Sequence, residues 1–525
     1  MTVFQYNNTR ISLSSKLLFI ALILLLPQFI SAQQKKKVEI VKAGSLKSSE
    51  SIANAQRLID SVVIKHEDIL MYCDSAYLYE NENRVDAFGH VHINQGDTLN
   101  LYAQKVFYNG NTSFAQAIHN VRLLNKDITL YTDTLDYDME QNIGYYDCFG
   151  RIVDSTNTLT SKIGRYYMNA NVAHFTDSVV GFSEKYTLES ENIKYNTESE
   201  IIYFEGPTTI RDSVNTLYAE DGWYNTMTGE ADLKLSPKVY NETQFLKAKQ
   251  IIYNKDDGDG FAYGDVHLED FENRTIVQGN YVAYNEINEL ATVTDSAVFI
   301  SYNETDSLFL HADTLRTMPD TIEGENIVKG YYGVRFYRKD IQGVCDSMTY
   351  YTKDSTVQLI NNPVLWSQNQ QITADRIELI QHFDAPDEIH MFKNSFIISE
   401  QDSGMYDQIK GKNMIGYVVN GKLNKMDVDG NGQTLYYARE EEEIIGMNRA
   451  ESSNISIRFK DGEIYQIAFQ KQPEGELKPI LELTENDKFL SDFKWLIKLR
   501  PTSRNDIFRK PKPATPEKTE EVAKE

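Results

Sequence analysis

The sequence predicts an all-β fold, a stacked antiparallel β-jellyroll or solenoid with a repeat of about 29 residues. The prediction rests on a tyrosine that returns at a fixed interval, a leucine seven residues before it and a small residue five residues before it. The tyrosines are Tyr108, Tyr137, Tyr166, Tyr195, Tyr224 and Tyr253, and the leucines are Leu101, Leu130, Leu159, Leu188, Leu217 and Leu246. Such a fixed period indicates units that bury their apolar faces by stacking on their neighbours.

Each unit is predicted to contain a strand, a polar turn and a returning strand. In one unit, residues 187–195 alternate in polarity, residues 196–200 form a polar turn and residues 201–204 resume an apolar run. The leucine and the small residue share one face of the strand, but the tyrosine lies an odd number of residues from both. Both halves can pack on one core only if the strand carries a bulge or a bend. We therefore expect a V-shaped cross-section.

The N-terminus has the pattern of a secretory signal peptide. Arg10 and Lys16 precede an apolar run at Leu17–Leu26, and small residues follow at Ser31 and Ala32. The alternative is a membrane anchor, but the apolar run is short for a span. We expect cleavage near Ala32 and export to the periplasm. Whether the protein associates with the outer membrane is left open.

The rest of the chain is predicted to fall into four segments. They are a lead-in at 33–65, a β-repeat region at 66–452, a C-terminal module at 453–499 and a disordered tail at 500–525. A chain of 525 residues would ordinarily divide into several cores, but a solenoid grows by adding rungs. The net charge of −24 argues against nucleic acid and anionic membrane surfaces as partners.

No motif predicts catalysis, a metal or a cofactor. Asp427–Gly432 resembles the start of a calcium loop, but Ala438 stands where a bidentate carboxylate is required, so a Gly-Asn-Gly turn is favoured. His90 and His92 could share a metal, but no third ligand is evident. We therefore predict that the chain is not an enzyme.

Aspartates and cysteines recur in the repeat and are given structural interpretations. The aspartates are Asp74, Asp133, Asp313, Asp346 and Asp375, for which we expect hydrogen bonds at the strand bend. Cys73 and Cys345 take the place of small residues in other units, so burial is expected. The sequence leaves open whether Cys148 forms a disulfide.

Several segments resemble the OstA-like family, which is related to LptA and to the N-terminal domain of LptD. They are residues 66–76, 89–93, 95–99 and 130–137, within a resemblance of roughly residues 60–500. The resemblance implies a β-jellyroll whose apolar interior carries the acyl chains of lipopolysaccharide across the periplasm. It also implies other Lpt-type β-jellyroll components as partners, and stacking through unpaired edge strands is one way to dock them.

The repeat supplies candidate residues for an apolar lipid groove. Leu130, Leu159, Leu188, Leu217 and Leu246 are expected to form one line, and Ile210, Val239 and Leu268 another. The alternative is that these side chains fill a solid core, as in a structural or adhesive repeat protein. A third alternative, a carbohydrate-active β-solenoid enzyme, predicts unmatched carboxylates in one unit, and none is found.

Overall fold

The computed structural model describes residues 37–510, apart from 49–53, 97–98, 320–325, 383, 403, 420, 441–442 and 461–462. The predicted signal peptide at residues 1–32 lies outside the described residues. The described residues divide into two compact units, one within Met1–Lys126 and Asp133–Asn142 and the other within Asp127–Thr132 and Ile143–Glu525. Both are built from antiparallel strands, which confirms the all-β prediction.

The first unit contains β1 (Glu39–Lys42), β2 (Ser45–Ser48), β3 (Gln56–His66), β4 (Ile69–Tyr79), β5 (Arg84–Gln95), β6 (Leu99–Asn109) and β7 (Phe114–Asn125). Strand β8 (Ile128–Asp138) contributes residues to both units.

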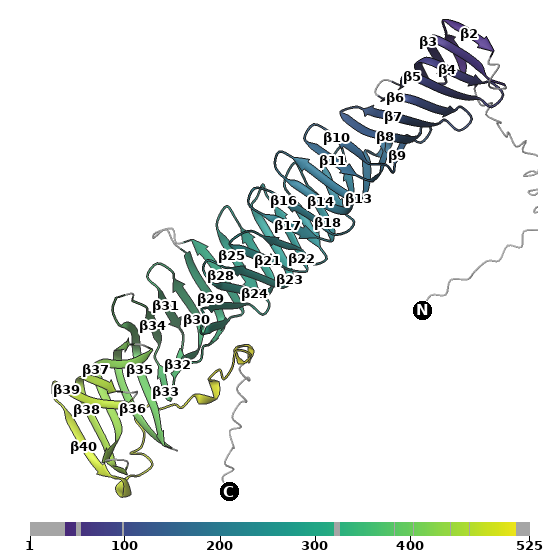
Figure 1. Cartoon of the computed structure of the whole chain (residues 1–525). Helices are drawn as coiled ribbons and strands as arrows, with labels where there is room; N and C mark the ends of the chain where they lie inside the picture. The colour runs from purple at the N-terminus through teal and green to yellow at the C-terminus, as the bar shows by residue number, and fades with distance from the viewer. Residues whose placement is uncertain are drawn as a thin grey trace, which may run out of the picture. The chain divides into compact units, whose positions relative to one another are not determined.

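In the second unit some rungs run as one long strand and others are divided into two short strands (Figure 1). The first of them are β9 (Ile143–Tyr146), β10 (Gly150–Val153), β11 (Asn157–Ser161), β12 (Ile163–Tyr167), β13 (Val172–Ser183), β14 (Thr187–Asn196), β15 (Ile201–Phe204), β16 (Thr208–Arg211), β17 (Thr216–Ala219), β18 (Asp221–Asn225), β19 (Ala231–Lys234), β20 (Lys238–Tyr240), β21 (Gln244–Lys247), β22 (Gln250–Asn254), β23 (Asp259–Asp270), β24 (Thr275–Asn285), β25 (Leu290–Thr294) and β26 (Val298–Tyr302).

The second unit continues with β27 (Ser307–His311), β28 (Thr314–Pro319), β29 (Asn326–Tyr337), β30 (Gln342–Tyr351), β31 (Thr356–Ile360), β32 (Val364–Ser367), β33 (Gln370–Thr373), β34 (Arg376–Ile380), β35 (Asp387–Asp402), β36 (Met405–Val419), β37 (Lys422–Glu440), β38 (Glu443–Lys460), β39 (Glu463–Gln470) and β40 (Glu474–Pro479). Its short 3-10 helices are η1 (Met168–Ala170), η2 (Ile480–Glu482), η3 (Ile497–Leu499) and η4 (Asp506–Phe508).

Each rung is bent into two halves, which we call the leucine arm and the tyrosine arm. In β6 the leucine arm is residues 99–103 and the tyrosine arm is residues 105–109, and the register with β5 shifts between them. Leu101 and Tyr108 are both buried although they are an odd number of residues apart. The bulge returns both halves to one inner face, so the predicted bend is confirmed. The same shift recurs in the pairs β4–β5, β13–β14, β23–β24 and β29–β30.

The corner between the arms is made by two consecutive residues in the left-handed region. Gly89 and His90 have φ of 77° and 43°, and Asp177 and Ser178 have φ of 64° and 57°. Glycine and short polar residues tolerate this conformation best, which explains the composition of the corners. At Gly89 the space is restricted as well, because a Cβ would lie 2.3 Å from Asp74 Oδ2.

The recurring aspartates lie at these corners. Asp74 Oδ2 is 2.8 Å from His90 Nδ1, and Asp375 Oδ1 accepts a 3.0 Å hydrogen bond from Asn394 Nδ2. The backbone amide of Asp375 donates to the carbonyl of Lys393 across the same corner. The predicted hydrogen-bonding role at the bend is therefore confirmed for these two aspartates.

The free ends of the arms are closed by turns in which an Asn or Asp side chain accepts from the backbone. Asn196 Oδ1 accepts from the amides of Glu198 and Ser199, both at 3.0 Å. Asp154 Oδ1 accepts from the amides of Thr156 at 2.8 Å and Asn157 at 2.6 Å. This local bonding explains why polar residues end each arm, and it confirms the predicted turn at residues 196–200.

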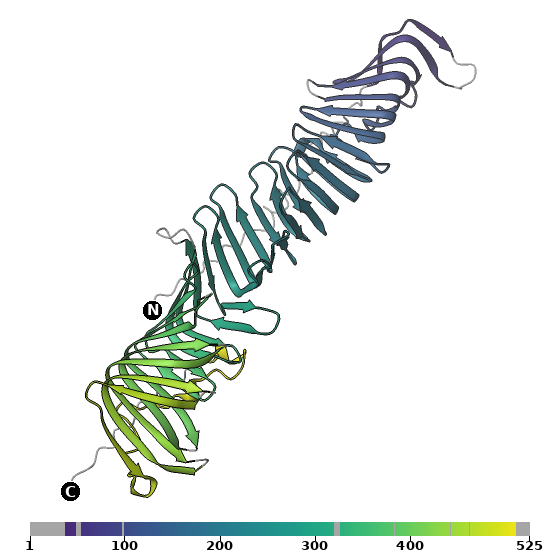
Figure 2. The same cartoon turned by 60° about the vertical axis from the view of Figure 1, so that its left-hand side comes forward.

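Two predicted boundaries of the repeat region are wrong because rungs extend beyond them. Strand β3 pairs with β4 and already carries the corner shift, so the first rung begins in the segment predicted as a lead-in. The boundary at residue 453 falls inside β38, which pairs with both β37 and β39. The strands at this end are long: β35 to β38 have 16, 15, 19 and 18 residues (Figure 2).

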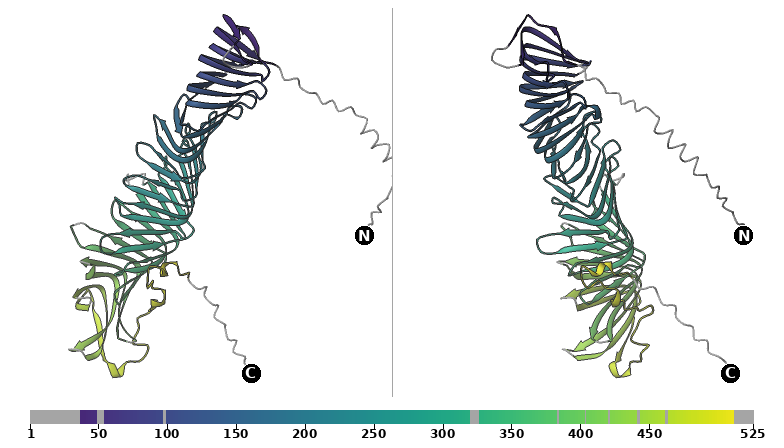
Figure 3. Two further views of the ribbon diagram at one scale, coloured as in Figure 1. Left: turned by 45° about the vertical axis from the view of Figure 1, so that its right-hand side comes forward. Right: turned by 90° about the vertical axis from the view of Figure 1, so that its right-hand side faces the viewer.

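The segment at residues 480–510, which we call the C-terminal strap, returns along the outer face of the leucine arm (Figure 3). Gln408 binds it through both amide atoms: Nε2 donates to the carbonyl of Lys488 and Oε1 accepts from the amide of Leu490, each at 2.8 Å. Gln371 binds the carbonyl of Lys494 and the amide of Leu496 in the same way, at 2.8 and 2.6 Å.

The strap corrects the prediction that a disordered tail begins at residue 500. Arg335 Nη2 donates to the carbonyl of Leu499 at 3.0 Å, and Arg500 Nε donates to Gln342 Oε1 at 2.7 Å. Ile507 is buried. The chain is thus folded to residue 510, because its strap satisfies buried polar side chains on strands far away in the sequence.

Candidate functional site

The predicted groove residues lie on the inner face and belong to one line rather than two. Cross-strand register places Ile210 between Leu188 and Leu217. It then continues through Val239, Leu246 and Leu268. The leucines alternate with Ile210, Val239 and Leu268 along this line because each rung contributes one outgoing and one returning strand to the leucine arm. Leu130 and Leu159 join the same line, with Ile152 between them.

Burial divides this line into two sections. The exposed fractions of Leu130, Leu159, Leu188 and Ile210 are 0, 2, 0 and 5%. Leu217, Val239, Leu246 and Leu268, which follow them, are only half-buried. A filled core therefore describes the first four residues, and an inner face partly accessible to water describes the last four. We call β3–β16 the closed section and β17–β26 the partly open section.

Hydrogen bonds between the tips of the two arms hold the closed section together. In the first unit, Tyr108 Oη at the end of a tyrosine arm is 2.6 Å from His66 Nδ1 at the end of a leucine arm. Tyr137 Oη donates to Gln95 Oε1 at 3.0 Å in the same arrangement. Burial is the main cause that raises the pKa of Tyr108, to about 12, so the hydroxyl is neutral at physiological pH.

The second unit repeats this bridge at Tyr195. Its hydroxyl donates to Asp154 Oδ2 at 2.6 Å and accepts from Asn157 Nδ2 at 3.1 Å. Tyr186 Oη donates to Asn157 Oδ1 at 2.8 Å. Burial is the largest cause that raises the pKa of Tyr195, and the bond to the Asp154 carboxylate adds to it. These bridges were not predicted, although a polar residue 41 or 42 positions before each tyrosine is a signal that the sequence contains.

In the partly open section the Tyr224 ring still packs edge-on against Tyr186, with centroids 6.0 Å apart, but the next two equivalent tyrosines turn away from the opposite arm. Tyr253 Oη donates at 2.8 Å to Glu286 Oε2, in a turn at the tip of its own arm. Tyr284 is 44% exposed. The apolar inner face is accessible here because neither the Tyr253 nor the Tyr284 hydroxyl crosses to the leucine arm.

The histidines considered as metal ligands have other contacts. His90 lies at a corner beside Asp74, whereas His92 Nε2 lies 2.9 Å from Asn100 Oδ1 and its ring stacks on Tyr102 with centroids 4.4 Å apart. Among the described residues, no group of three or more His, Cys, Asp and Glu side chains is placed to hold a metal ion.

The predicted burial of two cysteines is confirmed. Cys73 and Cys345 are buried, and burial raises the pKa of their thiols to about 11 and 12. Cys148 is exposed, with Sγ 3.4 Å from the Thr132 hydroxyl. The buried thiols are thus protonated and unreactive at neutral pH.

The segment that resembles a calcium loop is a corner inside β37. Gly430 and Asn431 have φ of 79° and 52°, like the corner pairs of other rungs. The favoured Gly-Asn-Gly turn is thus a corner within one strand, which continues to Glu440.

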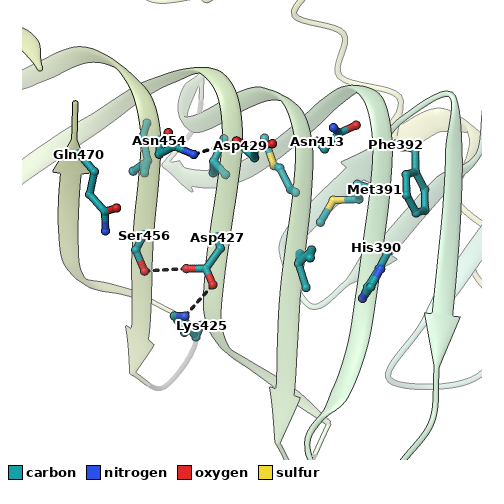
Figure 4. A pocket seen from close by; sticks show the side chains of 14 residues that line it. His390, Met391, Phe392, Asn413, Lys425, Asp427, Asp429, Asn454, Ser456 and Gln470 are labelled. Carbon is teal, nitrogen blue, oxygen red and sulfur yellow. Dashed lines mark hydrogen bonds and ion pairs between the residues drawn. The ribbon is translucent and has the colours of Figure 1, made fainter. Parts of the chain in front are cut away.

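Beside this corner, the outer face of the tyrosine arm carries a pocket with a mixed polar and apolar lining (Figure 4). Asp427 accepts from Lys425 Nζ at 2.6 Å and Ser456 Oγ at 2.7 Å, and Asp429 accepts from Asn454 Nδ2 at 2.8 Å. The pairs with Ser456 and Asn454 join β37 to β38, whereas Lys425 and Asp427 are neighbours on one face of β37. The pocket therefore combines these polar pairs with apolar side chains such as Met391, Phe392 and Ile415.

Comparison with known proteins identifies one family. A family model described as OstA-like protein matches residues 35–191, which is less than a third of the chain. The rungs continue far beyond this match, through the half-buried part of the inner line. A search of curated proteins found no match. In the described part of the chain, no helix has the length and apolar character needed to cross a membrane.

Proposed function

Residues 35–191 are those of an OstA-like protein, and on this premise we propose that the chain is a non-enzymatic lipopolysaccharide carrier of the periplasm. It would shield acyl chains on the inner face of its rungs during assembly of the outer membrane. The sequence pattern of a signal peptide supports export, and the resemblance supports other Lpt-type β-jellyroll components as partners at the strand edges.

One observation carries the proposal: the apolar line of the inner face changes from buried to half-buried at Leu217. Each CH₂ group removed from water contributes about 0.8 kcal/mol, so an acyl chain laid on this line would gain from every rung it covers. The residues of the line alternate between strands without a polar interruption from Leu188 to Leu268.

The test is photocrosslinking in cells with a photoreactive residue at Leu246 and, as the matched control, at Lys247. These two neighbours lie on opposite faces of β21: Leu246 is on the inner line and Lys247 is exposed. Lipopolysaccharide adducts at Leu246 and none at Lys247 support the proposal. No adduct at Leu246 in a folded, exported protein would contradict it and favour the alternative, a structural or adhesive scaffold with a solid core.

A further inference from the structure

The pocket on the outer face of the tyrosine arm crosses the strands β35 to β39 (Figure 4). Its volume is about 570 Å³, within the range of about 300–1,000 Å³ that is usual for sites of small ligands. It lies on the face opposite to the apolar inner line. A ligand in this pocket would therefore not occupy the surface proposed for acyl chains.

Cross-strand register arranges part of the lining as one row beside the corners. The row takes one residue from each strand, in the order Phe392, Asn413, Asp429, Asn454 and Gln470 (Figure 4). Strands lie about 4.8 Å apart, so the row extends over roughly 19 Å. It begins with an aromatic ring and continues with amides and a carboxylate. The row thus suits an extended ligand laid across the strands.

The Phe392 ring supplies a flat apolar surface at one end of the row. The Arg376 guanidinium of β34 lies over this ring, 4.3 Å from its centroid, and Asn413 is the cross-strand neighbour on the other side. Phe392 lines the pocket, whereas Arg376 does not. The side of the ring that is turned away from Arg376 is therefore the side that a ligand can cover.

Several polar groups of the row are free to bind a ligand. The Asn454 amide donates to Asp429 Oδ1 at 2.8 Å. Asn413 Oδ1 accepts from the backbone amide of Lys393 at 3.1 Å. Within the part of the chain that the structure describes, Asp429 Oδ2, Asn413 Nδ2 and the Gln470 side chain have no hydrogen-bond partner. These groups include both donors and acceptors, and a ligand hydroxyl needs both because it donates one bond and accepts others.

The charges of the pocket disfavour ionic ligands. Among the described residues that line it, Lys425 carries the ammonium group, which bonds to Asp427 at 2.6 Å and lies over the Tyr417 ring. The lining has two carboxylates, those of Asp427 and Asp429, so a free anion would meet an excess of negative charge. A cation would have to displace the groups that already bond to these carboxylates.

A ligand that fits these features has many hydroxyl groups, an apolar face and no net charge. Sugar rings combine these properties, because their C–H bonds form an apolar face and their hydroxyls lie around the edge. We infer that the pocket binds an uncharged stretch of a saccharide, with one sugar ring on Phe392 and hydroxyls on Asp429 and Gln470. The sugars of a glycolipid and of a free glycan share this chemistry. The site is separate from the inner line and does not depend on the proposed lipid binding.

The experiment measures binding of the exported chain to an array of uncharged oligosaccharides and to the saccharide that mild acid releases from lipopolysaccharide. We expect binding to at least one of them, followed by titration calorimetry of the best ligand. Binding of the released saccharide alone would support the inference with a glycolipid as the source, and binding of array glycans alone would support it with a free glycan. No binding, or binding only to sulfated oligosaccharides on the same array, would overturn the inference.

Gln470 and Gln466 provide a matched pair of variants on β39. Both side chains are exposed on one face of the strand, but only Gln470 lines the pocket. Gln470→Ala should weaken the best ligand about 3–10-fold through the lost hydrogen bonds, and Gln466→Ala should leave its affinity unchanged.

The ring surface is tested in the same way. Phe392→Leu removes the flat face but stays apolar, so the affinity should fall several-fold, whereas Phe392→Tyr keeps the ring and should keep the affinity. Thermal unfolding of each variant shows that the strands remain folded. Unchanged affinity in both Gln470→Ala and Phe392→Leu would place the saccharide elsewhere on the chain and overturn the assignment of the pocket.

Discussion

The closed and the partly open sections are built from the same repeat, yet their inner faces differ in accessibility. Tyr195 and Tyr253 occupy equivalent positions, but the Tyr195 hydroxyl bonds across to Asp154, whereas that of Tyr253 bonds to Glu286 on its own arm. Leu188 is buried and Leu217, the next leucine of the repeat, is half-buried. The comparison teaches that the bond between the arm tips, rather than the apolar pattern, distinguishes the buried part of the inner face from the half-buried part.

The largest expected difference between the sections concerns the leucines. Leu188→Ala removes buried methyl groups and leaves a cavity, so we expect a loss of about 3–5 kcal/mol in the stability of β14. Leu217→Ala should cost about 1 kcal/mol, because its side chain is already half in water. Amide hydrogen exchange of the two strands measures both. Equal losses would show that the two sections do not differ in packing.

The hydroxyl bridges should produce the next largest effect. Tyr195→Phe leaves the Asp154 carboxylate and the Asn157 amide without this partner, at a cost of about 1–3 kcal/mol. Tyr253→Phe loses a bond to an exposed carboxylate and should change local stability by about 0.5 kcal/mol or less. Hydrogen exchange in β11 and β22 separates the two. A Tyr253→Phe variant as unstable as Tyr195→Phe would refute the role assigned to the bridges.

High pH should weaken the closed section more than the partly open one. The folded state raises the pKa of Tyr108 to about 12, whereas an unfolded tyrosine titrates near 10. The folded state therefore binds the proton more tightly. The stability that this tighter proton binding contributes is complete below about pH 10 and is lost as pH rises through about 12.

At about pH 11 the stability lost through ionisation is roughly 1.4 kcal/mol for each tyrosine with such a shift. Burial raises the pKa of Tyr137, Tyr146, Tyr186 and Tyr195 as well, and all four belong to the closed section. The pKa is also raised at Tyr224, Tyr253 and Tyr284 of the partly open section, but these tyrosines are fewer and less buried. Hydrogen exchange measured from pH 9 to 11, corrected for its intrinsic rate, should therefore show an earlier loss of protection in β6 and β14 than in β24. Simultaneous loss in all three strands would contradict the comparison.

The corners should give the smallest effect, and the same one in both sections. Lys162 pairs with Asp177 at 3.1 Å in the closed section, and Lys249 pairs with Asp265 at 2.7 Å in the partly open section. All four side chains are exposed, so Lys162→Ala and Lys249→Ala should leave hydrogen exchange nearly unchanged. A large effect at one corner alone would place the difference between the sections at the corners instead of the arm tips.

The repeat period was sufficient to predict the rungs, the corner bulge and the residues of the inner face, because these depend on local alternation and on burial of one face. The division into sections was not predictable. Asp212 precedes Tyr253 by the same 41 residues as Asp154 precedes Tyr195, and it caps the same kind of turn. The local sequence is thus equivalent, and it does not indicate which carboxylate the tyrosine hydroxyl will bond.

The strap was missed for a different physical reason. Gln371 and Gln408 look like solvent-facing positions of a strand, yet both are buried because their partners come from residues 488–496. Side chain to backbone bonds over such sequence distances leave no periodic signal. Composition alone therefore assigned residues 500–510 to a disordered tail.

Thiol labelling of the lipid-free chain tests the central claim most directly. In a Cys148→Ser background, single substitutions Leu159→Cys, Leu188→Cys, Leu217→Cys and Leu246→Cys place one thiol at each position of the inner line, while Cys73 and Cys345 are buried. We expect rapid maleimide labelling at 217 and 246 and protection at 159 and 188. Equal labelling at all four positions would contradict the division into a closed and a partly open section.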